Sequence, residues 1–216
     1  YDVIVIGAGS IGVPTAMFCA EKDLKVLVLE ALPSVAQGDN KHAIGGIRAT
    51  HSQRGKIWAC QKSIEIFSTW QEMYNEDIDW EQGGYTFIAS REEDIELLKE
   101  TVKIQKEYVL NIDFVDKDKI KNLIPGINEN YILGGTYSPE DGHASPLLAL
   151  NSFYRRAIDL GAKFNFNEEV IDIITKKNEV IKVKSKKGVY KANYIVNAAG
   201  AFAKLVANMA DQSVPV

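Results

Sequence analysis

Residues 3–12 read VIVIGAGSIG, a short apolar run that leads into three glycines with the spacing G-x-G-x-x-G. The apolar run predicts a buried strand over residues 2–6. A helix is expected over about 10–22, with Pro14 in its first turn, where a missing N–H does least harm. KVLVLE at 25–30 predicts a second buried strand of the parallel type, which ends at Glu30. Strand, glycine turn, helix and strand in this order predict a Rossmann-type βαβ unit.

Each part of this motif has a physical task in binding a dinucleotide. Gly7 permits the tight turn, Gly9 lets a pyrophosphate approach the backbone, and Gly12 lets helix and strand pack closely. The helix N-terminus offers unpaired N–H groups and a partial positive charge to the phosphates. Glu30 accepts hydrogen bonds from the adenosine ribose, and its charge argues against a 2′-phosphate. The alternative is a glycine-rich turn without a ligand, but the two strands and the acid favour the dinucleotide site.

The composition is that of an ordinary globular protein: 216 residues, 46% hydrophobic and 25% charged, with a formal net charge of −4. This charge argues against a surface that coats nucleic acid or anionic membrane. No apolar run approaches the roughly 20 residues that a membrane-spanning helix needs. Two cysteines, Cys19 and Cys60, make neither a disulfide framework nor a metal cluster. We expect buried thiols and a cytoplasmic protein.

The remaining pattern predicts an α/β protein with a discontinuous cofactor domain. Helices are expected over 55–74, 91–110, 116–122 and 146–160, and strands over 84–90, 131–137 and 162–167. Three or four short strands joined by Lys-Asn and Lys-Gly turns follow, the last running into NAAGA at 197–201. We expect an inserted α+β substrate domain, which divides the chain into 1–80 (cofactor domain, first part), 81–142 (substrate domain) and 143–216 (cofactor domain, second part).

Two further features stand out. The stretch 37–51 is rich in glycine and shows neither the apolar spacing of a helix nor the alternation of a strand. Loops of this length inside compact domains are usually functional. The chain starts inside a strand without methionine and ends at DQSVPV, so we expect it to be part of a longer protein.

The order of these segments resembles the D-amino-acid oxidase superfamily of flavoenzymes. It is most similar to the branch of sarcosine oxidase beta subunits, dimethylglycine dehydrogenases and dye-linked L-proline dehydrogenases. The segments that carry the resemblance are VIVIGAGSIG with VLVLE, HAIGGIRATHS, GGYTFIAS, SPEDGHASP and YIVNAAGAFAKLVANMA. Where such family members have Trp after the NAAG turn, this chain has Phe202.

The resemblance implies FAD as the cofactor. It places the loop 43–46 along the isoalloxazine ring, the backbone of Val170 at the adenine, and residues 198–200 beside the diphosphate. The residues implied to bind FAD are Gly7, Gly9, Ser10, Ile11, Gly12, Glu30, Ala31, His42, Ala43, Ile44, Gly45, Gly46, Val170, Ala198, Ala199 and Gly200.

Three side chains of the 37–51 stretch are candidates for further chemistry, each with an alternative. Arg48 has a planar, always charged fork suited to a substrate carboxylate, or it binds protein groups only. His51 donates to a substrate or flavin group, or it is a structural histidine. His42 aligns with a histidine that some relatives bond covalently to the flavin, or FAD is held noncovalently. On the strand at 84–90, Tyr85 and Phe87 line a substrate cavity or pack in a core.

The function expected from these observations is oxidation of a C–N bond in a secondary or N-methyl amine or an amino acid, by hydride transfer to flavin N5. An FAD-linked hydroxy-acid or glycerol-phosphate dehydrogenase is a second alternative. A structural nucleotide-binding subunit of a larger complex is a third. The expected partner is a small-molecule substrate and not a nucleic acid, and no metal is expected; the oligomeric state is left open.

Overall fold

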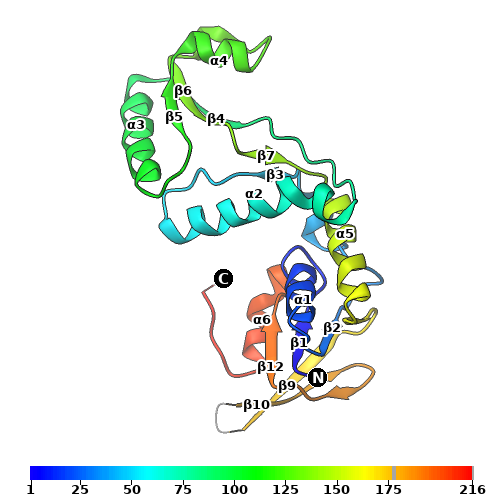
Figure 1. The fold of residues 1–216 in the computed structure, drawn as a ribbon. Coiled ribbons are helices and arrows are strands. Elements are labelled where there is room, and N and C mark those ends of the chain that lie inside the picture. Colours follow the sequence, from blue (N-terminus) through cyan, green and yellow to red (C-terminus); the bar gives the residue numbers. More distant parts are fainter. Residues whose placement is uncertain (177–178, 216) are drawn as a thin grey trace. The chain divides into compact units, whose positions relative to one another are not determined.

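The structure is a computed structural model that describes residues 1–176 and 179–215 (Figure 1). The chain forms two compact units. The first unit combines residues 1–44 with 146–216, and the second comprises residues 45–145. Within the described residues, no helix combines the length and apolar character needed to cross a membrane.

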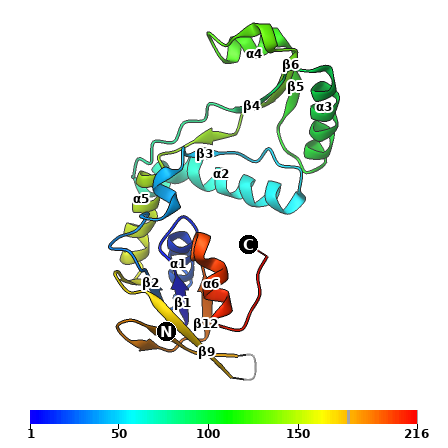
Figure 2. The same ribbon diagram turned by 180° about the vertical axis from the view of Figure 1, so that it is seen from behind.

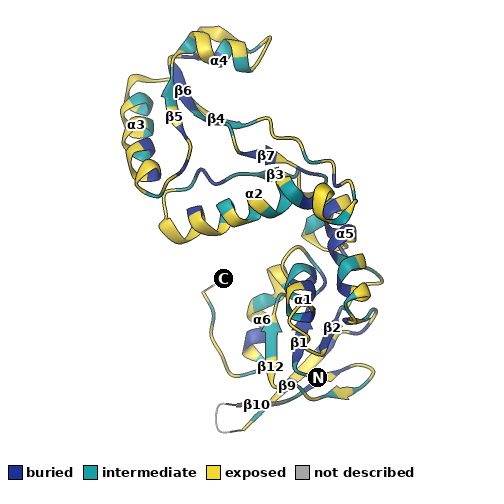
Figure 3. Ribbon diagram, in the orientation of Figure 1, coloured by how far each residue is buried: buried dark blue, intermediate teal, exposed yellow. Residues whose placement is uncertain are grey.

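The first unit is built on a four-stranded parallel sheet in the order β12-β1-β2-β8. Its strands are β1 (Val3–Ile6), β2 (Val26–Leu29), β8 (Lys163–Asn165) and β12 (Tyr194–Asn197). Every residue of β1 and β2 is buried (Figure 3), which explains their unbroken β-branched and leucine composition. This sheet and the helix after its first glycine turn confirm the predicted Rossmann-type α/β fold.

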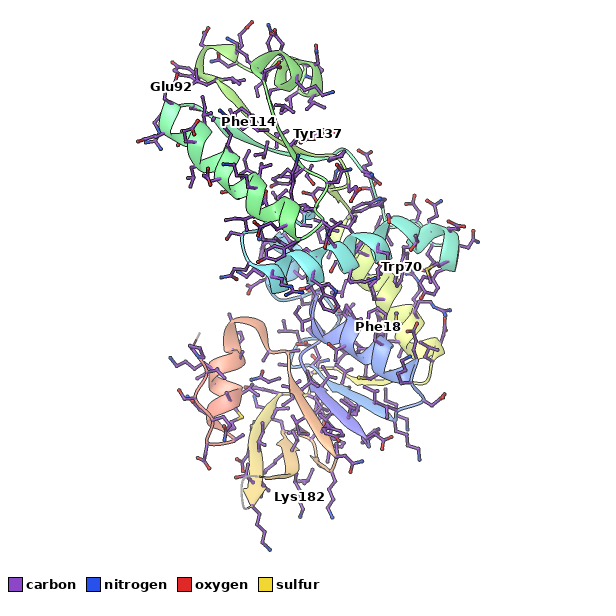
Figure 4. All side chains as sticks on the ribbon, turned by 60° about the vertical axis from the view of Figure 1, so that its left-hand side comes forward. Phe18, Trp70, Glu92, Phe114, Tyr137 and Lys182 are labelled. Atoms are coloured by element: carbon purple, nitrogen blue, oxygen red, sulfur yellow. The ribbon has the colours of Figure 1, made fainter. Side chains whose placement is uncertain are left out.

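Helices cover one face of this sheet. Helix α1 (Gly12–Ala20) packs on β1 and β2 and against α5 (Pro146–Asp159). The rings of Phe18, labelled in Figure 4, and Phe153 meet edge to face with centroids 6.3 Å apart. Gly161, with a φ of +90°, follows the end of α5, and its N–H donates to Ile158 O at 2.9 Å.

A three-stranded antiparallel meander covers the other face. Its strands are β9 (Val170–Lys176), β10 (Glu179–Ser185) and β11 (Val189–Tyr190), in the order β11-β10-β9. Ile173 and Val183 of the meander pack with Ile4 and Leu27 of the sheet and with Val206 of α6 (Ala203–Asn208). Figure 2 labels β9 and β12 in the view from behind. The predicted Lys-Asn turn at 177–178 lies outside the described residues.

The second unit contains an antiparallel sheet in the order β4-β6-β5. Its strands are β4 (Tyr85–Ala89), β5 (Asp113–Val115) and β6 (Gly134–Ser138), and they contact α3 (Glu92–Glu107) and α4 (Lys117–Leu123). Lys99 of α3 lies 5.5 Å above the ring of Phe114, which Figure 4 labels on β5.

Helix α2 (Arg54–Tyr74) and a two-stranded antiparallel pair complete the second unit. The pair joins β3 (Gly46–Ile47) to β7 (Gly142–His143). Ile57 and Ile64 of α2 pack with Ala49, and Trp70 of the same helix has no exposed surface. The buried residues Ile57 and Ile64 of α2 thus recur at helical spacing and mark its packed side.

Some expectations differ from the structure. Strand β5 was not predicted, and the segments predicted as loops contain the 3-10 helix η1 (Asp39–His42) and the strands β3 and β7. The strand predicted over 131–137 is β6 preceded by the 3-10 helix η2 (Glu129–Tyr131). Cys19 and Cys60 are free thiols that are only partly buried, because each lies at the margin of its helix's packed side.

By its contacts, the segment 45–80 belongs to the second unit, although the sequence analysis assigned it to the cofactor domain. A division into compact units by contacts does not identify which residues bind the cofactor. The functional division into 1–80, 81–142 and 143–216 therefore stays a prediction.

Candidate cofactor site

A cavity of about 570 Å³ opens in the first unit where three parallel strands end. The chain leaves β1 at Gly7, β2 at Glu30 and β12 at Ala198, and all three residues line the cavity. Ligands of open parallel sheets bind beyond the carboxyl ends of the strands, because the turns there present backbone groups and helix N-termini.

The three motif glycines have different surroundings. A Cβ on Gly7, whose φ is +105°, would lie 2.5 Å from Ala198 O, and one on Gly12 would lie 1.9 Å from Gly7 O. Real Cβ atoms do not approach so closely, so these two glycines are required by the close packing of β1, α1 and the turn after β12. A Cβ on Gly9 would meet no atom within 4 Å, and Gly9 lines the cavity. Gly9 thus leaves space on the cavity side, as the passage of a ligand requires.

The N-terminus of α1 is available to an anion. Among the described residues, the backbone N–H groups of Ser10 and Ile11 donate no hydrogen bond, and both residues line the cavity. The first turn of α1 carries no acidic side chain. Free N–H groups and the positive end of the helix dipole together favour a phosphate.

Glu30 is held by the backbone. Its Oε2 accepts the N–H of Ala8 at 2.6 Å, and its Oε1 accepts the N–H of Leu32 at 2.8 Å. A carboxylate has about four acceptor positions, so two backbone bonds leave acceptors for ribose hydroxyls. The bond to Ala8 fixes the carboxylate beside the glycine turn.

The turn after β12 forms the opposite wall. Asn197 Nδ2 donates to Ala203 O at 2.7 Å, and Asn197 Oδ1 accepts the N–H of Ala199 at 3.3 Å. Gly200 has a φ of +56° and open space at its Cβ position. Phe202, which departs from the family pattern, lines the cavity and is 66% exposed.

The structure brings most of the sequence-predicted cofactor residues together. The predicted residues that line the cavity are Gly7, Gly9, Ser10, Ile11, Glu30, Ala31, Val170, Ala198, Ala199 and Gly200. Gly12 lies beneath them at the turn. His42, Ala43 and Ile44 of the same unit are exposed and are not among its lining residues, and Gly45 and Gly46 belong to the second unit.

Sequence reasoning missed other lining residues. These include segment 37–40, Leu205 and Val206 of α6, and Met209 just after that helix. The glycine-rich composition of 37–51 marked the first group only as a functional loop. Asn40 Nδ2 donates to Pro146 O at 3.4 Å, which ties this loop to α5.

Arg48 lies within the second unit in a defined setting. Its Nη1 donates to Thr50 O at 2.6 Å and to Thr50 Oγ1 at 3.1 Å. Its guanidinium carbon lies 5.5 Å from the centroid of the Tyr85 ring and 5.1 Å from that of Phe87. Nε and Nη2 of Arg48 have no hydrogen-bond partner among the described residues, so one edge of the fork is free.

Asp141, which sequence reasoning did not single out, is fully buried beside Arg48. Its Oδ1 accepts the N–H of Ala49 at 2.9 Å, and its Oδ2 has no hydrogen-bond partner among the described residues. Burial raises the pKa of Asp141 above its ordinary value, although the Ala49 N–H, the nearby hydroxyls and Arg48 oppose the rise.

His51 follows the same segment. Burial lowers the pKa of His51, and the charges of Arg48 and Lys56 lower it further. Its carbonyl accepts Gln105 Nε2 at 3.0 Å. This backbone bond ties the segment to α3, and the lowered pKa favours a neutral imidazole at neutral pH. A role for His51 toward substrate or flavin stays a prediction.

Comparison with known proteins supplies the wider context. The chain is 25% identical over 208 residues to human mitochondrial dimethylglycine dehydrogenase, covering 96% of this chain and 24% of that protein. It is 26% identical to N-methyl-L-tryptophan oxidase of Salmonella enteritidis PT4, covering 94% of this chain and 54% of that one. It also matches the crystal structure of L-proline dehydrogenase from P. horikoshii with a TM-score of 0.91 and 27% identity, over 97% of this chain and 55% of that one.

The chain thus spans between a quarter and about half of these relatives. The family model described as FAD dependent oxidoreductase (DAO) matches residues 2–216. With the glycine turn, the acid after β2 and the cavity between them, this match shows that the chain belongs to the DAO family of FAD-dependent oxidoreductases.

Proposed function

We propose that the protein containing this chain oxidises a C–N bond of a secondary or N-methyl amine or of an amino acid. The observation that carries the proposal is the chemistry named for the relatives at 25% identity or more: dimethylglycine, N-methyl-L-tryptophan and L-proline oxidation. These substrates share a carboxylate and an oxidisable bond between carbon and nitrogen.

The first unit holds the adenosine diphosphate half of FAD in this proposal. The free N–H groups of Ser10 and Ile11 meet the phosphates, Glu30 meets the ribose, and Val170 borders the adenine. Gly9 leaves the space that a phosphate needs. When bound, FAD supplies the electron-accepting centre, N5, for the hydride.

Arg48 binds the substrate carboxylate in this proposal. One nitrogen of its fork is fixed by Thr50, and its guanidinium lies over the adjacent rings of Tyr85 and Phe87. The free edge suits a bidentate carboxylate, because the guanidinium is already held in place and stays charged. Tyr85 and Phe87 belong to the wall of the substrate site.

A substrate screen on the full-length protein tests the reaction class. Sarcosine, dimethylglycine, proline, glycine, several hydroxy acids and glycerol phosphate are each added anaerobically, and loss of the flavin absorbance near its visible maximum is followed. We expect bleaching by at least one of the amines. Bleaching only by hydroxy acids or glycerol phosphate would contradict the proposal, and a flavin that no small molecule bleaches would favour a structural subunit.

The role of Arg48 has its own test. Arg48→Lys keeps the charge but loses the planar fork, so KM for the carboxylated amine is expected to rise at least about tenfold, as for loss of a charged hydrogen bond. Arg54→Lys, on α2, is the matched control. An unchanged KM for Arg48→Lys would assign Arg48 to a structural role.

We further propose noncovalent FAD, a small-molecule substrate as the partner, and a cytoplasmic location, the last supported by the free thiols of Cys19 and Cys60. His42 is exposed at the end of η1, and a covalent histidyl link there is the alternative. The mass of the denatured protein decides: a mass increased by one flavin contradicts noncovalent binding.

A further inference from the structure

A buried carboxylate outside the cavity lining joins two of the cavity's walls. Glu168 is 4% exposed and is not among the residues that line the cavity. Its Oε1 accepts the hydroxyl of Ser185 at 2.6 Å and the hydroxyl of Tyr190 at 2.5 Å. A charged acceptor with two hydroxyl donors makes stronger hydrogen bonds than a neutral one.

The backbone around Glu168 reaches the Glu30 segment. The N–H of Glu168 donates to Glu30 O at 2.8 Å, and the N–H of Asn167 donates to Leu32 O at 3.0 Å. Residues 30–32 line the cavity. The main chain of Glu168 is therefore attached to the segment that carries the proposed ribose ligand.

Its side chain reaches the meander. Ser185 pairs with Val170 in the ladder between β10 and β9. Ser185 Oγ also accepts the N–H groups of Lys187 and Gly188 at 3.1 and 2.9 Å, which closes the turn between β10 and β11. Val170 and Glu169 line the cavity.

Glu168 thus connects the 30–32 wall, through its backbone, to strands β10 and β11, through its carboxylate, and β10 in turn pairs with Val170 of the 169–170 wall. Tyr190 adds a second tie, because Asn165 of β8 donates to its hydroxyl at 3.3 Å. Burial acts to raise the pKa of Glu168, but the hydrogen bonds from Ser185 and Tyr190 help to outweigh it, so the pKa is lowered and the carboxylate is charged at neutral pH.

We propose that Glu168 is a positioning residue for the adenosine half of FAD: it fixes the two walls that flank the ribose and the adenine before the cofactor arrives. The inference rests on the proposed placement of FAD in this cavity. This role predicts an effect on the affinity for FAD. If a wall of the cavity had to become ordered during binding, the cost of ordering it would weaken binding.

The test measures dissociation constants of FAD and of ADP for the apo form of the full-length protein, FAD directly by flavin fluorescence and ADP by competition. Variants are Glu168→Ala, Glu168→Gln and Tyr190→Phe. Asp172→Asn is the matched control, because it removes one negative charge from an exposed position on the same meander. Thermal unfolding of each apoprotein is recorded alongside.

We expect Glu168→Ala to raise both dissociation constants about tenfold and by the same factor, since loss of charged hydrogen bonds is of that size. Glu168→Gln keeps an acceptor oxygen and should recover part of the affinity. Asp172→Asn should match the wild type. A purely structural role predicts lower melting temperatures with unchanged dissociation constants in the folded apoproteins, which would overturn the proposal.

If Glu168→Ala fails to fold, the dissociation constants of FAD and ADP for Glu168→Gln and Tyr190→Phe test the proposal instead. Raised values for FAD and ADP in either variant support the proposal, and wild-type values in both overturn it. A wild-type protein that binds no FAD would instead contradict the proposed function, which separates the two failures.

Discussion

Gly9 and Gly12 differ in what surrounds their α-carbons. The Cβ of Gly12→Ala would lie 1.9 Å from Gly7 O, a backbone atom, whereas that of Gly9→Ala would enter open space in the cavity. We expect Gly12→Ala to destabilise the fold by about 1–3 kcal/mol or more, through overpacking. Gly9→Ala should leave stability within about 0.5 kcal/mol but weaken FAD binding strongly. Chemical unfolding and flavin titration measure the two effects.

Gly55→Ala is the control for this pair, because its Cβ also meets no atom within 4 Å but lies on α2, in the second unit. Normal stability and FAD affinity are expected. If Gly9→Ala bound FAD as tightly as Gly55→Ala, the phosphates would not pass over the glycine turn.

Asp141 predicts a dependence of stability on pH. Burial raises its pKa in the folded state, so between the unfolded value of about 4 and the raised value the native state binds more protons than the unfolded state. The free energy of unfolding therefore falls as pH rises through this window. Asp141→Asn should abolish the fall, so that the variant is more stable than wild type at pH 7 and loses this advantage below about pH 4.

Melting temperatures from pH 3 to pH 8 measure this effect. Glu140→Gln makes the same charge change at the exposed neighbouring residue and should run parallel to wild type. A variant Asp141→Asn that is less stable than wild type at pH 7 would mean that the charged carboxylate is favourable where it lies.

At the scale of elements, the pair α1 and α5 shields one face of the parallel sheet. Phe153 of α5 is 4% exposed and touches the ring of Phe18. Phe153→Ala should lower the free energy of unfolding by about 3–5 kcal/mol, because it removes a buried ring and leaves a cavity. Leu147→Ala, at a 45% exposed position of the same helix, should change it by about 0.5 kcal/mol or less. If both variants lost the same free energy of unfolding in denaturant, packing of the buried face of α5 would not be what stabilises this helix.

Elements with a strong local pattern were predictable from the sequence. β1, α1 and β2 follow from an apolar run, three glycines and a second apolar run, and α2 follows from apolar residues at helical spacing. β5 has three residues, and β3 and β7 have two each. Such short strands exist because of their partners: Gly46 pairs with His143, far along the chain, and no local periodicity reports that pairing.

The candidate site was predictable to the same extent. The glycines and Glu30 have a sequence signature, since their spacing is set by one βαβ unit. Asp141 and Glu168 have none, because their surroundings come from segments distant in sequence, Ala49 in one case and Ser185 with Tyr190 in the other. The roles of Asp141 and Glu168 depend on burial and on these partners, so they can be inferred only from the folded structure.

At the scale of the whole molecule, the cavity belongs entirely to the first unit, which is assembled from residues 1–44 and 146–216. Any ligand that fills it must therefore stabilise the association of these two distant segments. Binding to the native state adds RT ln(1 + [L]/Kd), about 2.7 kcal/mol at a ligand concentration of 100 times Kd. We expect FAD to raise the melting temperature of the full-length apoprotein in this concentration-dependent way.

The fragments of the cofactor sharpen this prediction. ADP contains the phosphates and the adenosine that the α1 N-terminus and Glu30 are proposed to bind, so ADP alone should also raise the melting temperature. Riboflavin lacks these groups and should raise it much less at equal concentration. Thermal unfolding with each ligand, in wild type and in Gly9→Ala, measures the difference, and the ADP effect should disappear in the variant. Stabilisation by riboflavin that equals or exceeds that by ADP would mean that the cavity at the ends of β1, β2 and β12 does not hold the adenosine half.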